Sequence, residues 1–322
     1  MKTVITVTKG AAFAMMLSAT TISSAQALTV YTAGPGSLAK SLASGYEKKT
    51  GVKVNIFQAT TGKVMARLEA EQANPQADVL ISASWDTAED LHHRGWLLPY
   101  QSANADKVPA NLKSADYVAQ GISALGIVWN TKSGTPEPKE WRDLTEAAFK
   151  DKVTTPDPAL SGASLDLLIG LQNGMGDKAW ALFDALKKNG MVVSGPNAQA
   201  VTPVMQGAKA AVFGAVDYVS YGNIHQGESL KVIFPASGTV IAPRPMMILK
   251  TSQHADDAKA FVDYVLSPEG QALVADAWLM PARSDVSAKR PLLNELKILP
   301  TAGEGTSERS AVLSRFNTLF AQ

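Results

Sequence analysis

The sequence contains no cysteine, and this absence excludes several kinds of site at once. Without thiols there is no disulfide framework, no cysteine nucleophile and no lipid-modified cysteine to anchor the chain. The 30 basic and 29 acidic residues nearly cancel, so no excess of positive charge favours nucleic acid as a partner. Beyond residue 27, no apolar run approaches the about 20 residues that a membrane-spanning helix requires. The chemistry of this chain must therefore come from hydroxyl, amide, carboxylate and basic groups.

An apolar stretch near the amino terminus is typical of a secretion signal. Two lysines precede and flank the run Ala11 to Ile22, and the small-residue motif AQA follows at residues 25–27. Residues 1–27 are therefore expected to be a cleaved signal peptide, so that the mature chain begins at Leu28 in the periplasm. An uncleaved anchor is the alternative, but the apolar run is too short to span a bilayer.

Short β-branched runs alternate with helical periods along the mature chain, which is the pattern of an α/β protein. Its length of about 295 residues is enough for two packed domains. Two extended segments, 121–128 and 236–243, are not of low complexity and are predicted to be hinge strands between lobes. The first lobe is expected to comprise residues 28–122 plus 241–290, and the second lobe residues 123–240. Residues 291–322 are expected to form a C-terminal helical segment that packs on both lobes.

Four predicted helix starts combine glycine with hydroxyl or amide side chains: GPGS (34–37), TTG (60–62), SGAS (161–164) and SGPN (194–197). The unpaired N–H groups of a helix start carry partial positive charge, and glycine lets an anion reach them. Because such loops lie at the carboxyl ends of strands in α/β folds, we expect the four to line one anion site. Ordinary N-capping is the alternative for each start taken alone. The candidate ligand-binding residues in these segments are Gly36, Ser37, Thr60, Thr61, Ser161, Gly162, Ala163, Ser164 and Asn197.

The segment GAVDYVSYGN, residues 214–223, contributes a carboxylate and two phenols within a short space. Asp217, Tyr218 and Tyr221 together suit the ammonium or hydroxyl groups of a ligand. The alternative places Asp217 as a cap or turn residue and Tyr218 in the core.

Three further candidates stand at or near strand ends. Arg244, between two prolines, would neutralise an anion with two parallel hydrogen bonds, or would form a surface salt bridge. Ser84 and Trp85 follow a predicted strand, where the tryptophan would either form a wall of the cleft or enter the core.

Catalytic and metal-binding patterns are missing from the sequence. There is no G-x-S-x-G, no H-E-x-x-H and no P-loop. His92 and His93 are adjacent, so they cannot share a helix face, and the other two histidines have no ligand spacing. We therefore expect a protein that is not an enzyme and holds no metal or other cofactor. A secreted phosphoesterase with the same anion site is the alternative.

The whole mature chain resembles the periplasmic substrate-binding components of ABC importers. The segments that carry this likeness are YTAGPGSLAKSLASGYEKKTGVKV, NPQADVLISAS, SGAS, VMQGAKAAV and LSPEGQALVADAWLMPARSDV. The resemblance is to the type II branch, which includes ferric-ion, 2-aminoethylphosphonate, thiamine and sugar-phosphate binders. It implies an α/β, two-lobed periplasmic-binding-protein fold with discontinuous domains, a monomeric receptor, and an inner-membrane ABC permease as partner.

The resemblance also bears on the ligand. Ferric binders of this family use a histidine, a glutamate and two adjacent tyrosines, and here those positions are Pro35, Ala83 and the pair Asp217-Tyr218. The SGA motif at 161–163 and Asn197 match the family's anion-binding motif. The resemblance therefore implies a small anionic ligand, a phosphonate or phosphate ester, whose organic end Asp217 would contact. The alternatives are a ferric-iron carrier and a polyamine or thiamine carrier.

Overall fold

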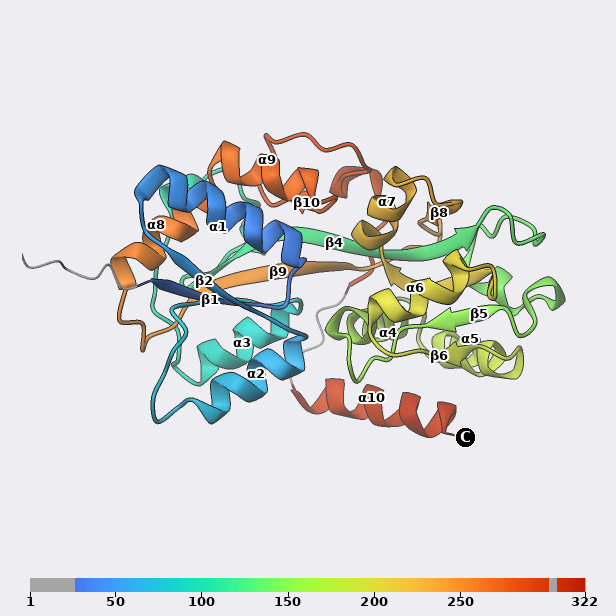
Figure 1. Ribbon diagram of the computed structural model, residues 1–322. Helices are drawn as coiled ribbons and strands as arrows, with labels where there is room; N and C mark the ends of the chain where they lie inside the picture. Colours follow the sequence, from blue (N-terminus) through green and yellow to red (C-terminus); the bar gives the residue numbers. More distant parts are fainter. Residues whose placement is uncertain (1–26, 301–305, 322) are drawn as a thin grey trace, which may run out of the picture.

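The computed structural model describes residues 27–300 and 306–321 (Figure 1). The predicted signal peptide lies outside the described residues, apart from Ala27 at its end. Within the described ranges, no helix combines the length and the apolar composition needed to cross a membrane.

Helices and strands alternate along most of the chain, as the sequence predicts. The strands are β1 (Leu28–Thr32), β2 (Val54–Gln58), β3 (Val79–Ile81), β4 (Tyr117–Asn130), β5 (Val153–Thr155), β6 (Val192–Val193), β7 (Ala211–Val216), β8 (Leu230–Ile233), β9 (Ile241–Ile248) and β10 (Met280–Pro281). The helices are α1 (Gly36–Thr50), α2 (Thr61–Ala70), α3 (Trp85–His93), α4 (Gly162–Met175), α5 (Asp177–Lys188), α6 (Asn197–Met205), α7 (Asp217–His225), α8 (Ala255–Val265), α9 (Pro268–Asp276) and α10 (Thr306–Phe320).

The strand β4 joins the two halves of the molecule. The strands lie in the order β2-β1-β3-β9-β4-β7-β5-β6, and β8 and β10 also pair with β4. The first part of β4, up to Ala124, pairs with β9, whereas the part from Leu125 onward pairs with β7 and β8. Every residue of β4 is buried, which explains why its sequence is an almost continuous apolar run. We call the β1–β3 and β9 side the first lobe and the β5–β8 side the second lobe (Figure 1).

A second extended segment runs beside β4 at this junction. Val240 accepts a hydrogen bond from the Leu125 amide at 3.1 Å, and β9 begins at the next residue. These two crossings lie near the two segments that the sequence analysis singled out. Residues 291–300, which lead from β10 to α10, cross a third time: the Leu299 amide donates to the Thr239 carbonyl at 2.7 Å, and Leu299 packs in the second-lobe core. The residue boundaries of the lobes stay a prediction.

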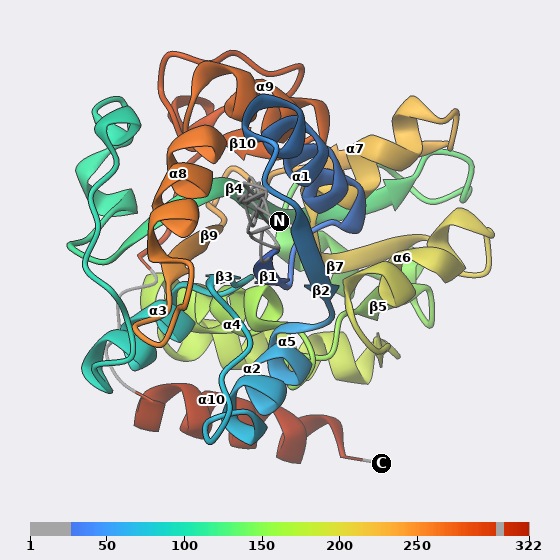
Figure 2. The ribbon, with the colours of Figure 1, turned by 60° about the vertical axis from the view of Figure 1, so that its left-hand side comes forward.

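Each lobe has helices on both faces of its sheet (Figure 2). In β1, Val30 packs into a cluster with α1 and α8, while Tyr31 faces the opposite cluster with α2 and α3. In β4, Ile127 and Trp129 pack toward α4 and α5, and Val128 packs toward α6. This alternation of apolar residues is what the two-residue period of a strand requires when both faces are covered.

The helix α10 packs along α4 and α5 and contacts both lobes. The Phe316 ring lies 6.4 Å from the Phe183 ring in the second-lobe core. The Arg309 guanidinium forms ion pairs of 2.8 Å with Asp86 on α3 and with Asp166 on α4. The guanidinium of Arg309 therefore bridges the first turn of α3, in the first lobe, and α4, in the second lobe.

The pKa of Asp166 links this bridge to pH. Burial raises the pKa of the Asp166 carboxyl to about 7, and Arg309 acts in the opposite direction. The folded protein therefore binds this proton more tightly than the unfolded chain, whose pKa is about 3.9. The resulting stability is fully present below pH about 4 and is lost as pH rises through about 7.

We expect Asp166→Asn to remove this part of the pH dependence. In the wild-type protein, deprotonation of the Asp166 carboxyl lowers the free energy of unfolding by up to about 4 kcal/mol between pH 4 and 7. Urea unfolding across that range measures the slope. Asp276→Asn, at an exposed position of α9, is the control and should keep the wild-type slope. An unchanged slope in the Asp166 variant would contradict the assignment.

Candidate functional site

A cleft of about 570 Å³ lies at the junction of the lobes. All four helix starts that the sequence predicts as anion sites line it. The contributing segments are residues 33–35 before α1, 59–61 at the start of α2, 160–163 at the start of α4 and 196–198 at the start of α6. The first two belong to the first lobe and the last two to the second, so the cleft receives positive helix ends from both sides.

Three of these helix starts are not capped by a side chain. The residues that precede the first turns of α1, α2 and α6 are Pro35, Thr60 and Pro196, and none makes a side-chain capping bond. Only Ser161, at the start of α4, accepts a hydrogen bond from a backbone amide of its own helix, that of Ser164. The capping alternative therefore accounts for one start of the four, and unpaired N–H groups of the others remain for a ligand.

Ser161 and Asn197 form a linked pair across two helix starts. The Asn197 side-chain amide donates to Ser161 Oγ at 2.8 Å, and the Ser164 amide donates to the same oxygen at 3.2 Å. With both acceptor positions of Oγ used, the hydroxyl proton of Ser161 is left to donate. Asn197 Oδ1 is buried without a hydrogen-bond partner. The Ser161 hydroxyl proton and Asn197 Oδ1 are therefore both available to form hydrogen bonds with a ligand in the cleft.

Arg244 is the strongest electrostatic feature of the cleft. It lies in β9 between β3 and β4 and is 3% exposed. Its guanidinium donates to the Ala33 carbonyl and to Tyr218 Oη, each at 3.3 Å, and lies 5.3 Å from the centroid of the Tyr218 ring. Nε has no partner, and no carboxylate of the described residues forms an ion pair with it. The alternative of a surface salt bridge is therefore wrong.

A buried cation without a counter-charge is costly. Moving a charged group out of water costs several kcal/mol even after the protein relaxes, and buried charges in proteins are normally paired. The contacts of Arg244 are one carbonyl, one phenol and the face of that phenol's ring. None of them carries a negative charge. An anion in the cleft would supply what is missing.

Asp217 does not line the cleft, which corrects the expectation that it contacts the ligand. Its carboxylate is fully buried and accepts hydrogen bonds from Arg290 at 2.5 Å, the Ala124 amide at 2.9 Å and the Tyr218 amide at 2.7 Å. Burial raises the pKa of this carboxyl, and Arg290 and the two amides lower it. Asp217 therefore holds α7 and the segment after β10 that carries Arg290 to β4, at the point where β4 passes from one lobe to the other.

Tyr221 and Trp85 also lie outside the cleft lining. Tyr221 stacks on Trp278 with ring centroids 6.1 Å apart, and burial raises its pKa to about 12. Trp85 packs edge-on against Tyr117, with centroids 5.1 Å apart. The expectation that these two aromatic side chains contact the ligand is therefore not supported by the lining of the cleft.

Four further predicted ligand-binding residues do not line the cleft: Gly36, Ser37, Ser84 and Ser164. Ser164 is buried and donates to the Pro156 carbonyl, while Ser37 is exposed on α1. Gly36 follows the cleft-lining Pro35 but does not itself line the cleft. Ser84 packs against Gly162, where an added Cβ would stand 2.8 Å from Ser84 Cβ. Glycine at 162 therefore allows close contact between the two lobes.

Three polar residues of the cleft were not anticipated from the sequence. Gln58, Lys63 and Ser123 line it. Gln58 ends β2, and polar residues at the carboxyl end of a strand are a signal that could have found it. Lys63 lies in the first turn of α2. Ser123 lies inside β4, where nothing in the sequence separates it from its neighbours.

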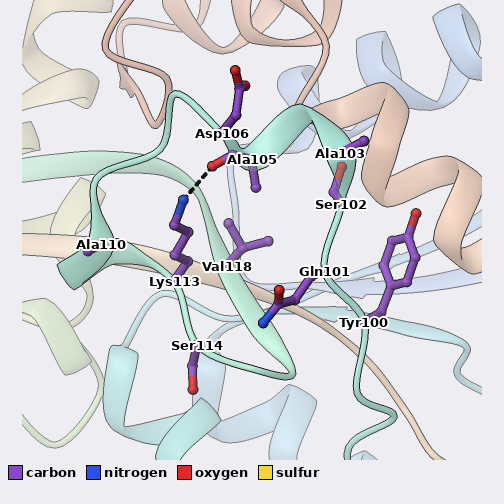
Figure 3. A pocket seen from close by; sticks show the side chains of 10 residues that line it. All are labelled: Tyr100, Gln101, Ser102, Ala103, Ala105, Asp106, Ala110, Lys113, Ser114 and Val118. Carbon is purple, nitrogen blue, oxygen red and sulfur yellow. Dashed lines mark hydrogen bonds between the residues drawn. The ribbon is translucent and has the colours of Figure 1, made fainter.

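A second pocket of about 570 Å³ lies elsewhere in the first lobe (Figure 3). It is formed by the segment from Tyr100 to Val118, and it contains none of the predicted site residues. Its lysine, Lys113, donates to the Ala105 carbonyl at 2.6 Å, and the Tyr100 hydroxyl donates to Asp263 at 2.8 Å. Because these polar groups already have partners, the cleft at the helix starts is the better candidate site.

The cleft offers little to a ferric ion. Of the positions that correspond to the iron ligands of ferric binders, Pro35 and Ala83 line the cleft but provide no ligand atom, and Asp217 does not line it and is bound to Arg290. Tyr218 alone remains. Across residues 27–300 and 306–321, no three His, Cys, Asp or Glu side chains come together as a metal cluster. Hard cations prefer several anionic oxygen ligands, so these residues do not fit Fe(III).

Comparison with known proteins identifies the family. A model of the bacterial extracellular solute-binding protein family matches residues 74–300. The chain belongs to this family. An uncharacterized protein of Haemophilus influenzae is 30% identical to this solute-binding protein over 264 residues, which cover 78% of this chain and 75% of the relative. A putative 2-aminoethylphosphonate-binding periplasmic protein of Salmonella typhimurium is 26% identical over 255 residues, which cover 75% and 73%.

Solved structures share the fold of this solute-binding protein. The periplasmic binding protein AfuA from Actinobacillus pleuropneumoniae, with exogenous fructose-6-phosphate bound, superposes with a TM-score of 0.79 at 25% identity, over 91% of this chain and 98% of AfuA. Iron-bound HitA from Pseudomonas aeruginosa also has a TM-score of 0.79, at 21% identity, over 91% of this chain and 99% of HitA. The prediction of a two-lobed, type II periplasmic-binding-protein fold is confirmed.

Proposed function

We propose that this solute-binding protein captures a small phosphonate or phosphate ester in the periplasm, as a monomer, and delivers it to an inner-membrane ABC permease. The observation that carries the proposal is Arg244, a buried guanidinium that lines the cleft without a carboxylate partner. The Salmonella typhimurium relative is named as a putative 2-aminoethylphosphonate-binding protein, and the structure of AfuA contains fructose-6-phosphate.

Three kinds of donor in the cleft suit a tetrahedral oxyanion. The helix starts that line it have N–H groups without a side-chain cap, the Ser161 hydroxyl has a proton to give, and the guanidinium of Arg244 supplies full positive charge. Charge-assisted hydrogen bonds of this kind are about twice as strong as neutral ones. A phosphate or phosphonate group has enough oxygens to use several of them together.

Closure of the lobes is the motion that this architecture favours. β4 and the segment before β9 both pass between the two halves, so small backbone changes there would move one lobe relative to the other. The close contact of Ser84 with Gly162 is made between the lobes and would be lost when they separate.

The cleft supports binding and not catalysis. Its lining, which lies wholly within the described residues, holds no histidine, carboxylate or cysteine to act as the base in hydrolysis of a phosphate ester. Ser161 Oγ accepts hydrogen bonds from two donors and has no base beside it to activate it as a nucleophile.

Isothermal titration with purified protein tests the proposal. We expect at least one organic phosphate or phosphonate, among them fructose 6-phosphate and 2-hydroxyethylphosphonate, to bind with a Kd in the micromolar range or below, and fructose without phosphate to show no binding. Ferric citrate is the comparison ligand, and a visible tyrosinate-to-iron colour would favour the iron carrier instead. If no phosphorus compound binds, the proposed function is refuted.

A further inference from the structure

The charges that line the cleft have one sign. Arg244 and Lys63 are basic, and no residue that lines the cleft is aspartate or glutamate. The remaining polar lining is neutral and includes Gln58, Ser123 and Tyr218. A ligand enclosed here meets positive charge and hydrogen-bonding groups, but no negative charge.

The carboxylates near the cleft are already engaged elsewhere. Asp217 is paired with Arg290 and is fully buried. Asp86 is paired with Arg309 and accepts a hydrogen bond from the Ser84 hydroxyl. Asp157 accepts from the Ala159 amide. Releasing any of them toward a ligand would break contacts that the folded chain uses, and in the case of Asp217 would leave a buried arginine unpaired.

We propose that the cleft selects a cargo whose organic end is neutral and hydroxylated, and that it discriminates against a cargo with an ammonium group. This inference rests on the proposed function and specifies its ligand class. An ammonium group that enters the cleft loses water without gaining a counter-charge, and it is repelled by Arg244 and Lys63. A hydroxyl at the same place loses little and hydrogen-bonds to neutral side chains such as Gln58 and Tyr218.

A matched pair of ligands tests the discrimination. 2-Aminoethylphosphonate and 2-hydroxyethylphosphonate differ only in the group at the organic end. We expect isothermal titration to show that the hydroxyl compound binds about 10- to 100-fold more tightly. Glucose 6-phosphate and glucosamine 6-phosphate repeat the comparison on a longer cargo. Equal or tighter binding of the amine in both pairs overturns the inference, and the proposed function stands as long as either compound binds.

A gain-of-function variant gives an independent readout. Gln58→Glu places one carboxylate in the cleft with almost no change in size, so we expect it to shift the preference toward the amine by about 10-fold. Gln101→Glu, in the second pocket, adds the same charge away from the cleft and should keep the wild-type preference. An unshifted preference in Gln58→Glu counts against the inference. If no phosphorus compound, fructose 6-phosphate included, binds any of these proteins, the proposed function itself has failed.

Discussion

Replacing Arg244 with methionine is expected to change two properties in opposite directions. The variant should lose phosphate or phosphonate binding by about 100- to 1,000-fold, because the cleft loses its only buried cation and the charge-assisted bonds that it offers. Its unliganded form should gain about 1–3 kcal/mol in unfolding free energy, because an unpaired buried charge is replaced by an apolar side chain of similar size. Isothermal titration and urea unfolding measure the two effects.

Arg283→Met is the matched control for this experiment. Arg283 is also buried, at 8% exposure, but it forms two hydrogen bonds with Asp285, at 2.9 and 2.7 Å, and donates to the Asn104 carbonyl. This variant should lose stability and keep its affinity. If Arg244→Met instead destabilises the unliganded protein and binds normally, Arg244 is a structural residue and the anion site is misplaced.

Replacing Arg290 with methionine is expected to cost about 3–5 kcal/mol of unfolding free energy. Removing one partner of a fully buried ion pair leaves the other charge without compensation, and Asp217 would retain only its two backbone donors. Because these donors lie in β4 and at the start of α7, the loss falls on the junction between the lobes. Urea unfolding of the purified variant measures it.

The double variant Asp217→Asn/Arg290→Met separates this structural role from ligand contact. With both charges removed, most of the lost stability should return, and the affinity for the organophosphorus ligand should stay within about 3-fold of wild type. A double variant that folds but no longer binds would show that Asp217 contacts the ligand after all. A loss below about 1 kcal/mol in Arg290→Met would show that the pair contributes little.

The sequence predicted the elements of the site better than their surroundings. Glycine next to hydroxyl or amide residues at helix starts is a local pattern, and the structure brings all four such starts to one cleft. The alternation of apolar residues in β1 and the continuous apolar run of β4 likewise follow from local rules about which strand faces are covered.

What could not be predicted depends on contacts between distant segments. The sequence predicts that Asp217 contacts the ligand, but its actual partner is Arg290. Arg290 lies 73 residues further along the chain, so no local pattern reveals the pair. The burial of Arg244 follows from the position of β9 between β3 and β4, which no feature of the segment APRPMM indicates. Periodicity shows that a side chain is buried, but it does not show which charged group forms an ion pair with it.

The shared strand has a consequence for how this chain can vary. Since β4 supplies hydrogen bonds to β9 on one side of the junction and to β7 and β8 on the other, a one-residue insertion or deletion in its middle would misalign two sheets in one event. Each displaced apolar residue, such as Ile127 or Val128, would turn its side chain to the wrong face of a fully buried strand. Insertions and deletions should therefore be tolerated in the loops and not in the middle of β4, whose length sets the separation of the two binding walls.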